Sequence, residues 1–359
     1  MISDQDLRAA VASGLINESQ AAKLTALSHS RRGARENLTA GDEPFELFRG
    51  FNEIFIVVGL LILASGWVGV VGAAITFSNS FLIPKVGVAS LISGVTAWAL
   101  SEYFVRKRRM VAPAIALSIL FAAAALVGFS SVFSQVFMVA QEDLSSLTLP
   151  LALSVGALAI FWLRFRVPFA MAIMALSVYT FALLLTSNIT AGPIAFQDLF
   201  LLSAEGAFAW ITLGIGFLVF ALAMVFDGSD PHRVTRRSSQ GFWLHIVAAP
   251  MLVNTVALTL LEQETAGARL LLFVLMMGFA LVAIIIDRRS FLIAAIGYLV
   301  GLAAIVFDGD GAAFTILALG VVLLTLGAFW TQIRAKLLTS VFYWLPLDRL
   351  PPAHSEVSE

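Results

Sequence analysis

The strongest constraint on the fold is a series of apolar runs of about 20 residues, separated by short polar or basic turns. A helix rises 1.5 Å per residue, so a run of this length crosses the roughly 30 Å hydrocarbon core of a bilayer. The sequence therefore predicts an all-α, polytopic membrane protein with ten transmembrane helices. The ten runs lie at 51–77, 82–104, 110–131, 146–163, 167–187, 200–226, 240–261, 269–286, 290–307 and 311–333.

Composition agrees with a lipid environment. Hydrophobic residues make up 60% of the chain and charged residues 13%, whereas soluble domains have about 45–50% and about 25%. The formal net charge of −1 gives no basic field for nucleic acid. The chain has no cysteine, which excludes disulfides, thiolate nucleophiles and cysteine zinc sites. We expect no cofactor, no metal site and no nucleic-acid partner.

Lysine and arginine predict the orientation. With the N-terminus in the cytoplasm, all of the 22 basic residues except Lys85 and Arg269 fall on the cytoplasmic side. The positive-inside rule therefore selects a topology with both termini inside, which agrees with an even number of spans. Three short basic turns, FVRKRRMVAP, WLRFRVPFA and IIDRRSFLIA, predict antiparallel neighbours for the helices on either side.

Residues 1–50 form a polar head without the apolar stretch of a cleavable signal peptide. Ser3 with Asp6 resembles a capping box, Gly14 occupies a helix C′ position, and Asn17 with Gln20 offers a second N-cap. These signals predict a hairpin of two short cytoplasmic helices. A DNA-binding helix-turn-helix lacks its third helix here, so the head is better interpreted as a docking or oligomerising element.

The remaining domain boundaries follow from the same pattern. Residues 51–333 form the transmembrane domain, and residues 334–359 form a cytoplasmic tail.

Glycines within the spans indicate close helix contacts, which are intramolecular seams or, for one GxxxG at Gly297 and Gly301, a homodimer face. The largest group of such glycines lies in the first span, at Gly59, Gly66, Gly69 and Gly72.

The span 240–261 holds His245, Pro250 and Asn254 within an apolar run. Proline removes a backbone hydrogen bond and bends a helix, while a buried imidazole or carboxamide needs a partner. This span is therefore the expected place for a polar interior. His245 and Asn254 are 900° apart around an ideal helix and should contact different neighbours.

Two further expectations, each with an alternative, concern ionisable groups at membrane depth, which are costly and mark functional sites by default. Glu53 and Glu102 share the cytoplasmic depth of His245, so one of them can form a carboxylate–imidazole pair that carries a proton. In the alternative, both carboxylates lie among headgroups and His245 donates to a backbone carbonyl. Glu205 and Asn254 can share a hydrogen bond near the outer side, as a cation or proton site or as a structural clamp.

The segments GLINESQAAKL, FELFRGFNEIF and FWLHIVAAP resemble a bacterial family of multi-span membrane proteins of unknown function, with an N-terminal Gly-Leu-Ile-x-x-x-Gln-Ala helical hairpin. The resemblance implies a bacterial inner-membrane location. It supplies no catalytic residues.

Two functions stay open at this point. The first is a transporter or channel-like protein for a small solute or ion, with Glu205, Asn254 and His245 along the route. The second is a non-catalytic membrane scaffold or envelope factor that recruits a partner, or a second copy, through residues 1–40. An enzyme is disfavoured because no acid, base and nucleophile can be named together.

Overall fold

The computed structural model describes the chain from 51 to 288 with short gaps, together with isolated residues before and after that region. The regular structure of the described residues is helical throughout. In full, the described residues are 10–11, 13–17, 20, 24, 51–76, 82–135, 138, 143–190, 198–202, 207–231, 233, 235–288, 296, 298, 317, 320–321, 324–325, 328–340 and 350–351.

Within these residues, eight helices are long and apolar enough to cross a membrane. They correspond to the first eight predicted spans, and the last two predicted spans lie largely outside the described residues. The eight are α3 (Phe51–Thr76), α4 (Leu82–Ser101), α5 (Ala112–Phe133), α6 (Thr148–Phe165), α7 (Pro168–Thr190), α8 (Phe208–Ser229), α9 (Arg236–Glu262) and α10 (Ala266–Ile286). Shorter elements are a π-helix at Glu102–Lys107, a 3-10 turn at Ser145–Leu147 and α13 (Trp330–Ser340).

Proline marks several helix starts as the sequence predicted. Pro113 is the second residue of α5, Pro150 the third of α6 and Pro168 the first of α7. The first turn of a helix has no internal acceptors for its N–H groups, so a missing N–H costs nothing there.

The sixth span begins later than the sequence indicated. The prediction placed its start at residue 200, whereas α8 begins at Phe208. The preceding segment folds onto α9 instead, where the Thr259 hydroxyl accepts from the Leu202 N–H at 3.0 Å and lies 3.2 Å from the Phe200 carbonyl. Because this side chain satisfies the backbone polar groups, the apolar residues here do not need to continue the helix.

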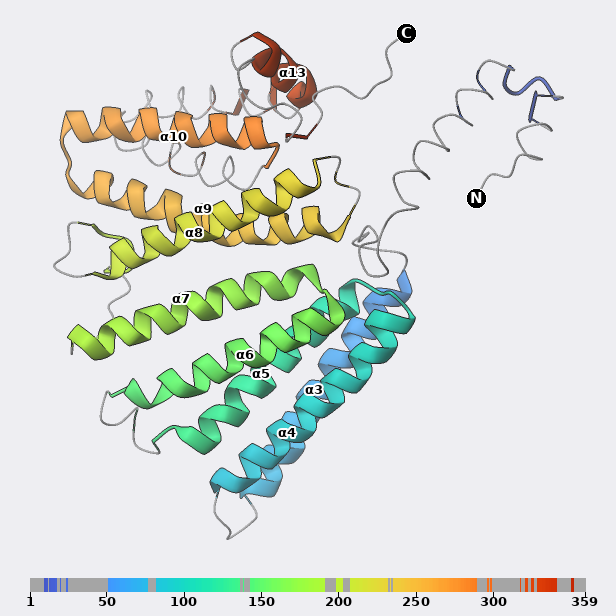
Figure 1. Ribbon diagram of the computed structural model, residues 1–359, viewed down its shortest axis with the longest axis vertical. Helices are drawn as coiled ribbons and strands as arrows, with labels where there is room; N and C mark the ends of the chain where they lie inside the picture. Colours follow the sequence, from blue (N-terminus) through green and yellow to red (C-terminus); the bar gives the residue numbers. More distant parts are fainter. Residues whose placement is uncertain are drawn as a thin grey trace.

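The helices follow one another across the molecule broadly in chain order, from α3 and α4 to α10, with α13 drawn beyond α10 (Figure 1). Two hydrophobic cores result. One is formed by α3 to α6 with the start of α7, the other by α7 to α10 with Trp330, and Trp162 packs against both. In α9, 61% of the span is buried, against 6% in α3. Helix α9 is therefore the central helix of the second core.

Close contact between α8 and α9 depends on glycine. A Cβ at Gly216 would lie 2.8 Å from the Cβ of Met251, closer than two such atoms can approach. The glycines of the first span behave differently from the prediction, because a Cβ at Gly59, Gly66, Gly69 or Gly72 would meet open space. Within the described part of the chain, these four glycines of α3 therefore form no intramolecular seam.

The two turn signals of the head are present. Gly14 has φ +73°, and the N–H groups of Gly14 and Leu15 bond to the carbonyls of Val11 and Ala10, as in a Schellman motif. Asn17 and Gln20 bond reciprocally, each backbone N–H to the other side chain, which is a capping box. Ser3 and Asp6, and most of the hairpin, lie outside the described residues.

Candidate functional site

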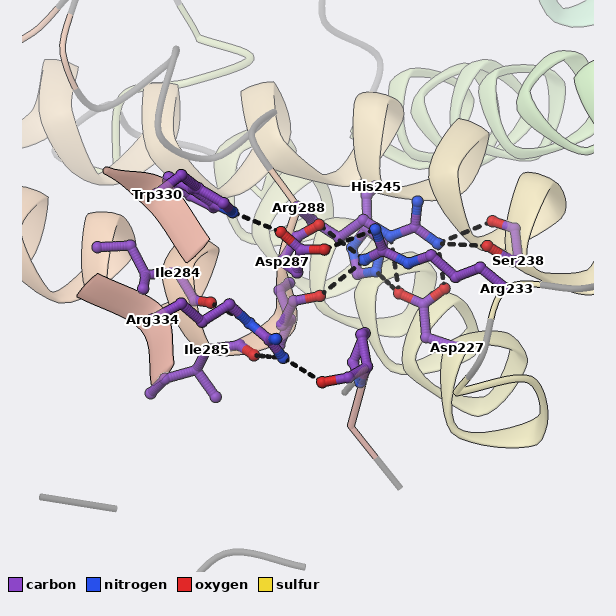
Figure 2. Close-up of polar contacts among 12 residues, drawn as sticks. Asp227, Arg233, Ser238, His245, Ile284, Ile285, Asp287, Arg288, Trp330 and Arg334 are labelled. Atoms are coloured by element: carbon purple, nitrogen blue, oxygen red, sulfur yellow. Dashed lines mark hydrogen bonds and ion pairs between the residues drawn. The ribbon is translucent and has the colours of Figure 1, made fainter. Parts of the chain in front are cut away.

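The candidate site lies where the end of α8, the first turns of α9, and Asp287 and Arg288, which follow α10, meet (Figure 2). We call Asp227, Ser238, His245 and Arg288 the inner ion cluster. His245 is fully buried, and Asp227 and Arg288 are 5% and 7% exposed. Charged groups with so little exposure need compensating partners inside the protein.

Asp227 is the centre of the inner ion cluster. Its Oδ2 lies 2.9 Å from His245 Nε2 and accepts from Arg288 Nε at 3.0 Å, while its Oδ1 accepts from Arg288 Nη2 at 2.5 Å. Arg288 therefore binds the carboxylate with two parallel hydrogen bonds, the strongest geometry for this pair of groups. Arg288 Nη2 also donates to the Ser238 carbonyl at 2.8 Å.

The local sequence explains how these groups reach one another. Asp227 lies in the last turn of α8 and points at α9 beside Gly241, where a Cβ would lie only 2.4 Å from Asp227 Oδ1. Asp287 ends α10 with left-handed backbone angles, φ 55° and ψ 44°. That conformation is unusual for a residue with a side chain, and it turns the chain so that Arg288 follows the end of the helix.

A second group of contacts, the outer ion cluster, consists of Arg233, Asp287 and Trp330. Arg233 Nη1 and the Trp330 indole donate to the two Asp287 carboxylate oxygens at 2.7 and 2.6 Å. Arg233 Nη2 donates to the Asp287 carbonyl at 2.7 Å. Burial lowers the pKa of the Arg233 guanidinium and the charge of Arg288 lowers it further, whereas Asp287 raises it. The outer ion cluster fastens the turn after α8 and the start of α13 to the end of α10.

Arg334 completes the end of α10. Its Nε donates to the Ile284 carbonyl at 3.0 Å, and its Nη2 donates to the carbonyls of Ile285 and Pro351 at 3.2 and 2.6 Å. The last carbonyls of a helix have no partner within the helix, so Arg334 supplies one. Burial lowers the pKa of Arg334.

His245 has a carboxylate partner, but it is neither of the two that the sequence suggested. Glu53 instead accepts from the N–H groups of Val111 and Ala112 at 3.2 and 3.0 Å, at the start of α5. Glu102 forms exposed ion pairs with Arg106 and Arg164 at 3.0 and 2.8 Å. The idea that His245 shares a proton with Glu53 or Glu102 is therefore wrong in the choice of partner. Backbone N–H groups at the start of α5 bind Glu53, and two arginines bind Glu102, so neither glutamate is left for His245.

Asn254 and His245 contact different neighbours, as their spacing predicted. The Tyr298 hydroxyl donates to the Asn254 side-chain oxygen at 2.9 Å, beyond α10, while His245 contacts Asp227 of α8. Glu205 lies outside the described residues, so its proposed bond with Asn254 stays a prediction.

Sequence reasoning missed Asp227 and counted Arg288 only as a topology signal. A usable signal was present. Asp227, Asp230 and Asp287 are acidic residues in turns that are otherwise basic. An acid retained among arginines, at the end of an apolar helix, indicates an ion pair rather than a solvated turn.

Among the described residues, no group of three or more His, Asp or Glu side chains is placed to hold a metal ion. Comparisons with protein-family models, with curated proteins and with solved structures found no match to this chain. We therefore base the functional argument on the inner ion cluster. In it one carboxylate, Asp227, is shared between the His245 imidazole and the Arg288 guanidinium.

Proposed function

We propose that this chain is an integral membrane transporter or channel-like protein for a small solute or ion, and that a proton held between His245 and Asp227 controls passage. The observation that supports this proposal is the burial of an imidazole, a carboxylate and a guanidinium together against α9. Ionisable groups are rare in apolar bundles because burial is costly, and in membrane proteins they mark ion and proton routes.

The position of the cluster on α9 supports a moving part. Helix α9 is the most buried of the described spans and contains Pro250. A change of charge on His245 would alter its attraction to Asp227, and through it the contact between α8 and α9. By the positive-inside rule, this end of the bundle faces the cytoplasm. The resemblance to bacterial proteins supports an inner-membrane location as part of this proposal.

Flux measurements test this proposal. The purified protein is reconstituted in proteoliposomes, and solid-supported membrane electrophysiology records currents on addition of K⁺, Na⁺, NH₄⁺, amino acids or small carboxylates. We expect a current for at least one of these, reduced about tenfold or more in Asp227→Asn, a loss equivalent to ~1.4 kcal/mol or more in the transport barrier. Equal currents in wild type and variant would remove the inner ion cluster from the route.

A second candidate function is recruitment of a partner by the head. It is favoured by two exposed leucines of the head. Leu15 follows the Gly14 turn and is 80% exposed, and Leu24, seven residues after Asn17, is 45% exposed. Apolar side chains displayed on a capped turn suit a protein contact. Deletion of residues 1–40 should then abolish function while the helical bundle still inserts, whereas a transporter should retain its flux.

A further inference from the structure

A small cavity lies beside the inner ion cluster, between α5, α7 and α9. Its volume is about 150 Å³, and its apolar wall includes Ile115, Phe169 and Trp243. Phe169 and Trp243 meet edge to face with their ring centroids 4.6 Å apart. A cavity of this size holds a ligand about as large as benzene.

Arg288 lines the same cavity and has hydrogen-bonding capacity to spare. Its Nε and Nη2 are bound to Asp227 and Ser238, as the dashed lines in Figure 2 show. Its Nη1 makes no hydrogen bond to a described residue, although the side chain is only 7% exposed. Nη1 is not one of the fully buried atoms that lack a partner in the described part of the chain, so this donor is accessible and can bond to an acceptor placed in the cavity that Arg288 lines.

The rest of the polar lining suits an anion. Ser238 and Ser239, in the first turns of α9, also line the cavity, and the described lining contains no carboxylate. The start of a helix carries a partial positive charge. Arg236 and Arg237 open the same helix. The site therefore joins an aromatic wall to donors that favour negative charge.

We propose that this cavity binds a small organic anion, with its oxyanion at Arg288 Nη1 and Ser239 and its apolar body against Phe169 and Trp243. The oxyanion can belong to a soluble carboxylate or to the phosphate of an anionic lipid headgroup, one that has no cationic group beside the phosphate. The apolar part of a ligand that fits inside the cavity has roughly six to ten non-hydrogen atoms. Binding is measured without transport, so the two proposals are tested separately. The anion site can be refuted while the proposed transport function stands, and transport can be refuted while the anion site stands.

Isothermal titration calorimetry with benzoate tests the soluble source, with benzyl alcohol as the uncharged ligand of similar shape. We expect benzoate to bind at least tenfold more tightly than benzyl alcohol. Ile115→Phe should fill the cavity and weaken benzoate binding at least tenfold. Ile119→Phe is the matched control, because Ile119 lies one turn further along α5, is 47% exposed and does not line the cavity. The control should bind benzoate as the wild type does.

Nanodiscs test the lipid source. If a headgroup is the ligand, phosphatidylglycerol should raise the unfolding temperature of the wild type above its value in phosphatidylcholine, and Ile115→Phe should abolish that difference while Ile119→Phe keeps it. Either pattern, with benzoate or with phosphatidylglycerol, supports the anion site and identifies its source. Absence of both effects, or effects of equal size in Ile115→Phe and Ile119→Phe, would overturn it.

Discussion

Asp287 and Arg288 are adjacent in the chain, yet their side chains serve separate ion clusters. Asp287 accepts from Arg233 and Trp330, whereas Arg288 donates to Asp227 on α8. The end of α10 therefore connects the inner ion cluster directly to α13. A displacement of α8 relative to α10 would change the contacts of both clusters, because the two side chains belong to consecutive residues at the end of α10.

The first prediction concerns Gly241. In Gly241→Ala the new Cβ would lie 2.4 Å from Asp227 Oδ1, so the carboxylate must move. We expect the free energy of unfolding to fall by about 1–3 kcal/mol, the usual cost of overpacking. Chemical denaturation in detergent measures it. Gly214→Ala is the control, since a Cβ there meets open space, and it should be neutral or stabilising by up to ~1 kcal/mol. Equal losses in both variants would contradict the packing described at Asp227.

The second prediction separates stability from function. Asp227→Leu leaves Arg288 buried without its carboxylate and should cost about 3–5 kcal/mol of unfolding free energy. The double variant Asp227→Leu with Arg288→Met removes both charges and should recover most of that loss. A double-mutant cycle measures the coupling. Additive losses would show that the two side chains do not form an ion pair in the folded protein.

The third prediction concerns the C-terminal tail. Arg334→Met removes donors from three carbonyls, including that of Pro351, and should free the tail from the end of α10. Bonds from charged donors contribute about 1.5–3 kcal/mol each, so limited proteolysis after residue 340 should become faster. Lys336→Met removes the same charge from an exposed position of α13 and should leave the cleavage rate unchanged. The account of the tail fails if both variants are cleaved like the wild type.

The fourth prediction concerns topology. The chain has no cysteine, so single cysteines report without background. Lys107→Cys follows α4 at the basic end, and Gln263→Cys follows α9 at the other end. A membrane-impermeant maleimide should label the two from opposite sides of the membrane. Labelling from the same side would refute the threading of the chain through the bilayer.

The sequence was a good guide to helices and a poor guide to polar partners. Apolar length and early prolines located the first eight spans, because the cost of unpaired backbone groups in lipid leaves helices as the available structure. The start of α8 was misplaced because Thr259 satisfies backbone groups that a sequence leaves unassigned. The choice of partner for His245 failed for a related reason. Depth along a span can be counted, but which helix lies beside α9 depends on contacts such as that of Gly216 with Met251.

The central claim is that the contact between His245 and Asp227 controls passage, rather than only holding α8 to α9. The most direct test is His245→Gln, because glutamine can still donate to Asp227 but cannot take up a proton. Unfolding temperature and proteoliposome flux are measured on the same preparation. The account predicts an unfolding temperature within about 2 °C of the wild type, equivalent to roughly 1–2 kcal/mol for a chain of 359 residues, and a flux reduced at least tenfold. Wild-type flux in a stably folded His245→Gln protein would contradict it.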